Sequence, residues 1–235
     1  MPTTPEGRPP AETMFDENFW DERYSGSHAV WSGNPNPQLL AEMESFPTQA
    51  PPIAAPSAAR PGWPAALDVG CGEGADSIWL ARRGWHVTAV DISRVALQKA
   101  EQHAKALELP GSIVWEHHDL LAWAPPAAAF DLVNAQFMHL PSQDRIPVFA
   151  RLAAAVAAGG TLLVVGHSSQ DILAGAKRPN APDLYFTAAE VAASLDPRAW
   201  RVEVAEARPR SAAGVDGETI TIHDEVLRAV RIATS

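Results

Sequence analysis

The fold is decided by residues 65–93, AALDVGCGEGADSIWLARRGWHVTAVDIS. The apolar run 65–70 is typical of a buried strand, and residues 75–83 carry apolar side chains at helical spacing after a glycine-rich turn. The run 86–90, HVTAV, predicts a second buried strand. A strand, a helix and a second strand within about 30 residues indicate a βαβ unit, whose two strands lie parallel in one sheet.

The same alternation continues along the chain. Further helices are expected at 93–108, with Ser93 as the N-cap, and at 142–157 and 187–195. Further strands are expected at SIVWEH (112–117), FDLVNAQF (130–137) and TLLVVGH (161–167), and the runs 200–208 and 219–231 predict a hairpin. The prediction is an α/β, doubly wound, Rossmann-like sheet of seven strands, mostly parallel, with an antiparallel C-terminal hairpin and helices on both faces.

The segments before residue 65 differ in composition from the rest. We expect a disordered tail at 1–12, then helices at 15–24 and 38–46 separated by the turn-forming WSGNPNP, so that 13–46 form one helical segment. Residues 47–64 are rich in Pro and Ala and predict a loop. The remaining residues, 65–235, form the predicted main domain.

Composition excludes several classes of function. The chain of 235 residues has 18 Lys and Arg against 28 Asp and Glu, a formal charge of −10, so no nucleic-acid partner is expected. Cys71 is the only cysteine, which excludes an intrachain disulfide and a cysteine-based metal cluster and fits the reducing cytoplasm. No signal peptide is expected in residues 1–11, and 153–166 is too short to span a membrane. We therefore predict a cytoplasmic protein without metal or membrane partner.

The glycine turn lies where open α/β sheets bind ligands, at the carboxyl end of the first strand. Gly70, Gly72 and Ala75 also satisfy the dinucleotide fingerprint G-x-G-x-x-A, so a dinucleotide enzyme is a competing interpretation. However, a pyrophosphate bound here would face the carboxylates of Glu73 and Asp68. The charges favour a nucleoside ligand that is cationic and lacks phosphate.

The carboxylates of Asp68, Asp91 and Asp119 lie at the ends of three successive predicted strands. Asp91 follows the second strand at the place where an acid accepts hydrogen bonds from ribose hydroxyls. Asp119 follows the third strand and could accept a hydrogen bond from an adenine amino group. The alternatives are that Asp68 caps the following helix and that Asp119 is a turn residue.

Through LDVGCGEG, VDIS, HDLL, FDLVNAQFMHL and GGTLLVVGH, residues 65–167 resemble the class I methyltransferases that use S-adenosylmethionine (SAM). The resemblance implies strand order 3-2-1-4-5-7-6 with an antiparallel seventh strand. It also implies a cofactor site in which the glycine turn lies against the methionine part of SAM, Asp91 binds the ribose and Asp119 meets the adenine. The cofactor-binding residues expected in this domain are Asp68, Gly70, Cys71, Gly72, Gly74, Asp91, Ile92, Asp119, Leu120 and Gln136.

The methyl acceptor is expected beside the end of the fourth strand. His139 follows that strand and is a candidate general base, with a packed structural histidine as the alternative. His167, just past the fifth strand, is a second candidate. The turn 134–137 lacks the prolines typical of amino-group methyltransferases that act on DNA bases. His117 and His118 are interpreted as surface residues rather than metal ligands, because no third ligand has a suitable spacing.

The N-terminal FWDERY and VWSGNPNP are similar to the start of the tellurite-resistance and thiopurine-methyltransferase-like branch. In that branch an N-terminal helix covers the cofactor, so the resemblance implies a lid with Trp20, Arg23 and Trp31 at the cofactor and Tyr24 and Asn34 beside them. Arg23 could pair with the SAM carboxylate. The alternative is a helix whose aromatic side chains complete the core. We expect few contacts to fix this segment in the absence of cofactor.

The predicted function is transfer of a methyl group from SAM to a small-molecule S, O or N acceptor by in-line displacement. Two other classes stay open. One is a protein that binds SAM as a sensor or scaffold without turnover, and the other is an NAD(P)-dependent oxidoreductase. Binding of SAM, S-adenosylhomocysteine (SAH) and NAD(P) would distinguish them.

Overall fold

The structure, a computed structural model, describes residues 16–26, 28–44, 63–173, 176, 178, 181–214 and 217–233. The helices are α1 (Glu17–Tyr24), α2 (Pro37–Glu44), α3 (Ala75–Ala81), α4 (Arg94–Lys105), α5 (Ser142–Ala155), α6 (Gln170–Leu173) and α7 (Ala188–Ala193), with a 3-10 helix η1 (Pro182–Leu184). The strands are β1 (Ala65–Val69), β2 (His86–Asp91), β3 (Ser112–His117), β4 (Phe130–Gln136), β5 (Val156–His167), β6 (Trp200–Ala213) and β7 (Thr219–Arg231). The predicted tail at 1–12 and most of the predicted loop at 47–64 lie outside the described residues.

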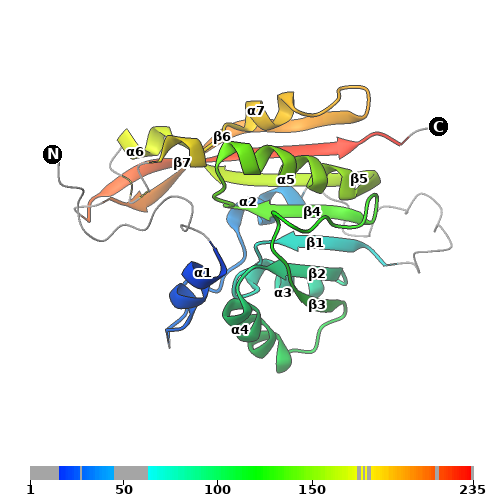
Figure 1. The fold of residues 1–235 in the computed structure, drawn as a ribbon, viewed down its shortest axis with the longest axis vertical. Coiled ribbons are helices and arrows are strands. Elements are labelled where there is room, and N and C mark those ends of the chain that lie inside the picture. The colour runs from blue at the N-terminus through cyan, green and yellow to red at the C-terminus, as the bar shows by residue number, and fades with distance from the viewer. Residues whose placement is uncertain are drawn as a thin grey trace.

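The strands form one seven-stranded sheet in the order β3-β2-β1-β4-β5-β7-β6 (Figure 1). Strands β3, β2, β1, β4 and β5 pair in parallel, whereas β7 is antiparallel to both β5 and β6. The predicted strand order, the parallel core and the C-terminal hairpin are confirmed. The carboxyl ends of β1 and β4 point to the side of the molecule on which α1 and α6 lie.

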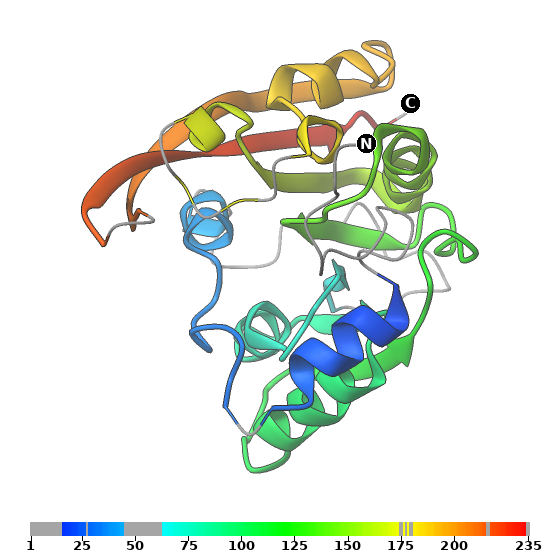
Figure 2. The ribbon, with the colours of Figure 1, turned by 60° about the vertical axis from the view of Figure 1, so that its left-hand side comes forward.

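Two apolar clusters lie on the two faces of the sheet, because successive strand residues point to opposite sides. Leu67 of β1 and Val133 of β4 face α5 and α7, where they meet Phe149 and Val191. The other face of β1 and β4 packs against α2 and α3. Figure 2 shows α2 and α3 on the same side of the sheet, opposite α5. The predicted arrangement of helices on both faces is therefore observed.

Helix α2 is attached to the C-terminal hairpin by buried charges. Glu42 forms ion pairs with Arg208 of β6 at 2.6 Å and with Arg228 of β7 at 3.1 Å. Gln38 donates a hydrogen bond to the carboxylate of Asp224, also in β7, at 3.2 Å. Buried pairs of this kind specify a docking position, since leaving one partner without the other is costly. An early helix thus packs against the last strands of the chain.

The boundary between α5 and β5 differs from the prediction. The helix ends at Ala155 and the strand begins at Val156, whereas the sequence predicts a helix to 157 and a strand from 161. Val156 pairs with Phe130, and the register shifts before Thr161 pairs with Leu132. The alanine-rich run favours a helix by local propensity, but pairing with β4 overrides that preference.

The N-terminal helices were expected close to where they are observed. α1 begins two residues later than predicted, with Asp16 as its N-cap, and the Asp16 side chain accepts a hydrogen bond from the Phe19 N–H. Helix α4 has the predicted N-cap, Ser93, whose hydroxyl accepts from the Ala96 N–H. The short elements α6 and η1 have no counterpart in the sequence prediction. No helix in the described part of the chain is long and apolar enough to cross a bilayer.

Candidate active site

The glycine turn between β1 and α3 is held against the end of β2. The N–H groups of Gly70 and Cys71 both donate to the Val90 carbonyl, at 2.9 and 3.1 Å. Gly70 has a positive φ of 67°, and an added Cβ would meet only Met138 Cγ, at 4.0 Å, among the described residues beyond its chain neighbours. A positive φ favours glycine because side chains crowd the backbone there. The turn therefore presents bare backbone with space above Gly70.

Asp91 links this turn to the end of β2. Its Oδ2 accepts the Gly72 N–H and its Oδ1 accepts the Ser93 N–H, each at 2.8 Å. Burial raises the pKa of the Asp91 carboxyl, and the backbone N–H groups of Ser93 and Gly72 oppose that shift. Each carboxylate oxygen keeps a further lone pair, since a carboxylate has about four acceptor positions. Asp91 is thus a fixed acceptor beside the turn.

Gly74 has a packing role in this structure. An added Cβ would lie 2.7 Å from the Trp115 ring and 2.9 Å from the Ala100 Cβ. Gly74 is also the left-handed N-cap of α3, with φ 85°. The sequence assigned it to the cofactor, but its open side is filled by α4 and β3. Close approach of a helix to the sheet is enough to require glycine here.

Asp68 is buried and its carboxylate joins three elements. Oδ2 accepts from the Ser77 hydroxyl at 2.5 Å and Oδ1 accepts from the Asn134 side chain at 2.9 Å. The Asn134 amide also donates to Asp76 at 3.2 Å. Burial, followed by the neighbouring charge of Asp76, raises the pKa of Asp68 to about 7. Both oxygens have side-chain partners in α3 and β4, but Asp68 does not cap α3, whose N-cap Gly74 has no side-chain cap hydrogen bond.

The N-terminal segment lies directly on the glycine turn. The hydroxyl of Tyr24, a buried residue, would be 2.9 Å from a Cβ added at Gly72, and it accepts a hydrogen bond from Trp31 Nε1 at 2.7 Å. Glu73 accepts the N–H groups of Val30 and Trp31 at 3.0 and 3.2 Å. Burial raises the pKa of Tyr24. The predicted proximity of this segment to the turn is therefore observed.

More contacts fix this segment than the sequence led us to expect. Asp21 in α1 accepts the Ser93 hydroxyl at 2.5 Å and the Val95 N–H at 3.3 Å, so it adds a cap to α4. The Asn36 N–H donates to Asp76 at 2.6 Å. The Arg23 guanidinium lies 5.9 Å from the Trp20 ring and 5.3 Å from the Trp31 ring, within the range of cation–π contacts. The backbone N–H of Asn34 donates to the Ser32 hydroxyl.

The third predicted acid lies in a turn. Asp119 is exposed after β3, and its carboxylate accepts the Leu121 N–H at 2.8 Å, as the turn alternative predicts. Leu120 is partly buried against the core. The Ile92 carbonyl accepts from His117 Nε2 at 2.8 Å. His118 stacks on Trp123 at 4.2 Å, and no metal-binding group of acids, histidines and cysteine occurs among the described residues.

The two candidate histidines come together beyond the end of β4. The rings of His139 and His167 have centroids 5.2 Å apart, and Phe137 stacks on His167 at 4.2 Å. Burial, followed by the charges of Arg178 and Arg23, lowers the pKa of His139 to about 4. Burial and Arg178 also lower the pKa of His167, so both rings are neutral at neutral pH. Gln136 donates to the Asn134 side chain, while its Oε1 is buried with no hydrogen-bond partner among the described residues.

Several residues of this region were not singled out from the sequence. Arg178, which donates to His167 Nε2 at 2.7 Å, follows β5 in a stretch with no periodic pattern. Asp76 and Asp21 are ordinary acidic residues on predicted helices. A carboxylate in the first turn of a helix could have been noticed at Asp76, but its contact with Asn36 spans 40 residues.

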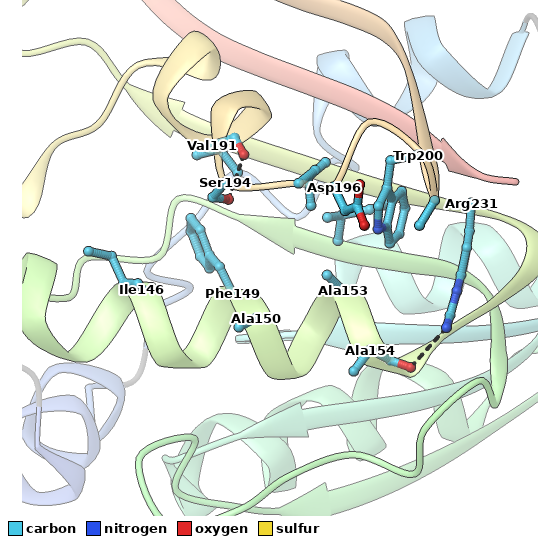
Figure 3. A pocket seen from close by; sticks show the side chains of 13 residues that line it. Ile146, Phe149, Ala150, Ala153, Ala154, Val191, Ser194, Asp196, Trp200 and Arg231 are labelled. Carbon is cyan, nitrogen blue, oxygen red and sulfur yellow. Dashed lines mark hydrogen bonds between the residues drawn. The ribbon is translucent and has the colours of Figure 1, made fainter.

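A separate hollow of about 320 Å³ lies between α5 and α7 (Figure 3). It is near the start of β6 and the end of β7, away from the carboxyl ends of the parallel strands. Its walls are mostly apolar, and its polar groups have partners. Ser194 donates to the Val191 carbonyl, Asp196 pairs with Arg198, and Arg231 donates to the Ala154 carbonyl. This hollow has no arrangement suited to chemistry.

Comparisons with known proteins agree with this geometry. Residues 66–160 match the family model described as a methyltransferase domain. An uncharacterized methyltransferase of Mycobacterium tuberculosis is 42% identical over 101 residues, a match that covers 42% of this chain and 48% of the relative. The matched part therefore spans about half the length of that relative.

Solved structures share the fold over most of the chain. One, from work on the conversion of a disulfide bond into a thioacetal group during echinomycin biosynthesis, has a TM-score of 0.65 at 22% identity and covers 93% of each chain. TehB from Haemophilus influenzae has a TM-score of 0.62 at 17% identity, covering 92% of this chain and 66% of TehB. At these identities the likeness shows the fold. Residues 66–160 are thus similar to a methyltransferase domain, and the solved structures that share the fold include SAM-dependent methyltransferases.

Proposed function

We propose that this chain transfers the methyl group of SAM to a small-molecule acceptor. The observation that carries the proposal is Asp91, a buried carboxylate fixed by two backbone N–H groups next to an open glycine turn. In the methyltransferase domain this is the position at which an acid would bind the ribose. The thioacetal-forming process named for the structural neighbour concerns a small molecule, echinomycin, which supports an acceptor of that class.

The residues present fit SAM. The space above Gly70 admits a ligand close to the backbone, and the turn carries no lysine or arginine that would repel a cation. The Gln136 Oε1, buried without a partner among the described residues, is an acceptor suited to an N–H donor such as the ammonium of SAM. When bound, SAM supplies an electrophilic methyl group on a positively charged sulfur. We propose Gly70, Gly72, Asp91 and Gln136 as its principal binding residues.

The chain's own residues would contribute mainly by position. The N-terminal segment places Tyr24 and Trp31 on the turn, which excludes water from the space beside it. His139, neutral at neutral pH, has the protonation state that a proton acceptor needs. His167 is less suited to that role, because its Nε2 already accepts a hydrogen bond from Arg178. We therefore propose His139 as the general base for acceptors that must lose a proton.

Calorimetry with SAM, SAH and NAD⁺ tests this assignment. Micromolar binding of SAM and SAH without binding of NAD⁺ is expected, and the reverse would make the chain a dinucleotide enzyme. Transfer of a labelled methyl group from SAM to a panel of small thiols, phenols and amines then tests turnover. Binding of SAM with no product from any acceptor would contradict the proposal and favour a sensor or scaffold.

A further inference from the structure

The hydrogen bond between Arg178 and His167 fixes the tautomer of the histidine. A guanidinium can only donate, so His167 Nε2, 2.7 Å from Arg178 Nη1, must be the acceptor. Burial, then Arg178, lowers the pKa of His167 to about 2, so the ring is neutral and its single proton is on Nδ1. His167 therefore presents an N–H donor beside His139, on the acceptor side of the site.

Two donors at this place have no acceptor in the described part of the chain. His167 Nδ1 and Arg178 Nε are both buried and lack a hydrogen-bond partner among the described residues. Leaving a buried donor unsatisfied costs about 1–3 kcal/mol, and more for a charged group. The Nδ1–H and Nε2 positions lie on different sides of the imidazole ring, and Nε2 faces Arg178, so the two donors need separate acceptor atoms.

The charge of Arg178 is also uncompensated in the described part of the chain. Asp171 and Asp224, the two acids whose charges raise the pKa of Arg178, have other partners. Asp171 accepts the His223 N–H with both oxygens, at 3.1 and 2.9 Å. Asp224 accepts from Arg210 Nε with both oxygens, at 3.0 and 2.8 Å. No ion pair joins Arg178 to a carboxylate among the described residues, so the acceptor that fits is an anion.

The position of Arg178 and His167 indicates that the anion is a group of the methyl acceptor and not of SAM. His167 ends β5, and β5 is separated from β1 and its glycine turn by β4. Two strand spacings are about 10 Å. The aromatic ring of Phe137 stacks against His167 and provides an apolar wall at the same point.

We propose that the methyl acceptor carries a carboxylate, which binds to the Arg178 guanidinium. This inference rests on the proposed methyltransferase function. A carboxylate would accept a charge-assisted hydrogen bond from the buried Arg178 Nε and compensate the charge of the guanidinium. His167 accepts from Arg178 through Nε2 and leaves its Nδ1–H for a different acceptor atom of the ligand. Arg178 thus selects acidic acceptors over neutral ones of the same shape.

Benzoate and benzamide are suitable probes because they differ in charge and hardly in shape. We would titrate each into the protein by calorimetry, with and without saturating SAH. Benzoate is expected to bind at least tenfold more tightly than benzamide. Arg178→Gln should remove this preference and leave SAH affinity unchanged, while Arg178→Lys, which keeps the charge but lacks the Nε donor, should retain part of it. The control Arg198→Gln changes an exposed arginine that pairs with Asp196 and should behave like the wild type.

Equal affinities for the two probes, no binding of either, or an unchanged preference in folded Arg178→Gln protein would overturn the proposal. A fall in SAH affinity in that variant would also overturn it, by assigning Arg178 to the cofactor. Circular dichroism of each variant reports folding. Binding of SAH to the wild type tests the proposed function by itself. The benzoate preference is also measured without SAH, so the two proposals can fail independently.

Discussion

The side chain of Asp91 is buried, and both of its carboxylate oxygens accept backbone hydrogen bonds. Its two oxygens are held by the Gly72 and Ser93 N–H groups, so the side chain needs no rearrangement to accept ribose hydroxyls. We expect Asp91→Ala to weaken SAH binding by about 1.5–3 kcal/mol, the loss of a hydrogen bond to a charged group. Calorimetry would measure this, with Asp196→Ala at an exposed site as the control. Unchanged affinity in a folded Asp91→Ala protein would contradict the ribose assignment.

Gly72 offers a sharper test, because the structure names the atom that a side chain would meet. A Cβ at this position would lie 2.9 Å from the Tyr24 hydroxyl, at a φ of +53°. Gly72→Ala should reduce SAH affinity at least tenfold, through displacement of Tyr24 and strain in the turn. In a Tyr24→Phe background the same substitution should cost less, because the clashing oxygen is gone. Equal costs in both backgrounds, by a double-mutant cycle, would show that Tyr24 is not the obstacle.

Among the elements, α1 depends on Asp21 for its docking onto α4. The carboxylate serves the Ser93 hydroxyl and the Val95 N–H, both in the first turn of α4 or at its cap. We expect Asp21→Ala to increase hydrogen exchange in peptides covering 16–26, while peptides from the central strands keep their protection. Glu22→Ala, a change at the exposed neighbouring acid, is the matched control. Equal exchange in the two variants would mean that other contacts hold the helix.

The N-terminal segment as a whole can be removed to test its part in binding. Deleting residues 1–36 exposes Glu73 and Asp76, whose partners in this segment are Val30, Trp31 and Asn36. The shortened protein should keep the sheet but bind SAM more weakly and lose most turnover. Deletion of 1–10 should change little. Far-ultraviolet circular dichroism and calorimetry would compare the two proteins, and full SAM affinity after removal of 1–36 would exclude a role for the segment in binding.

The central elements could be predicted because local and tertiary preferences coincide in them. The glycine turn, the apolar strands and the Ser93 cap each have a short-range sequence signal. The start of β5 could not be predicted, since Val156 leaves the helix only because Phe130 is there to pair with it. Gly74 was assigned to the cofactor because a glycine required by packing against Trp115 has the same signal as one required by a ligand.

Fewer of the residues on the methyl-acceptor side of the site could be predicted from the sequence. His139 and His167 were found from their places after strands, which topology brings to one edge. Arg178 and its hydrogen bond to His167 could not be found, because the residues after β5 follow no period that predicts where a side chain lies. The positive charge that Arg178 brings to this part of the site is therefore seen only in the folded structure.

At the scale of the whole molecule, the buried acid Asp68 links stability to pH. Its pKa is raised from 3.8 to about 7, so the folded state holds a proton that the unfolded state has lost between these values. This contribution to stability is fully present below about pH 4 and is lost as the pH rises toward 7. Relative to Asp68→Asn, the free energy of unfolding of the wild type should fall across this window. Urea unfolding at several pH values would measure both, and parallel profiles would contradict the assignment.

The attachment of α2 to the C-terminal hairpin has a consequence for synthesis of the protein on the ribosome. Glu42 precedes its partner Arg208 by more than 160 residues, and Leu39 on the same helix is completely buried in the finished fold. At about 5–20 residues per second, the nascent chain grows for roughly 8–33 seconds between these two positions. For that time Glu42 has no ion-pair partner on the hairpin, and only the earlier elements, among them β1, β4 and α3, can cover the apolar side of α2. The helix is therefore held by apolar contacts alone until the last strands are made.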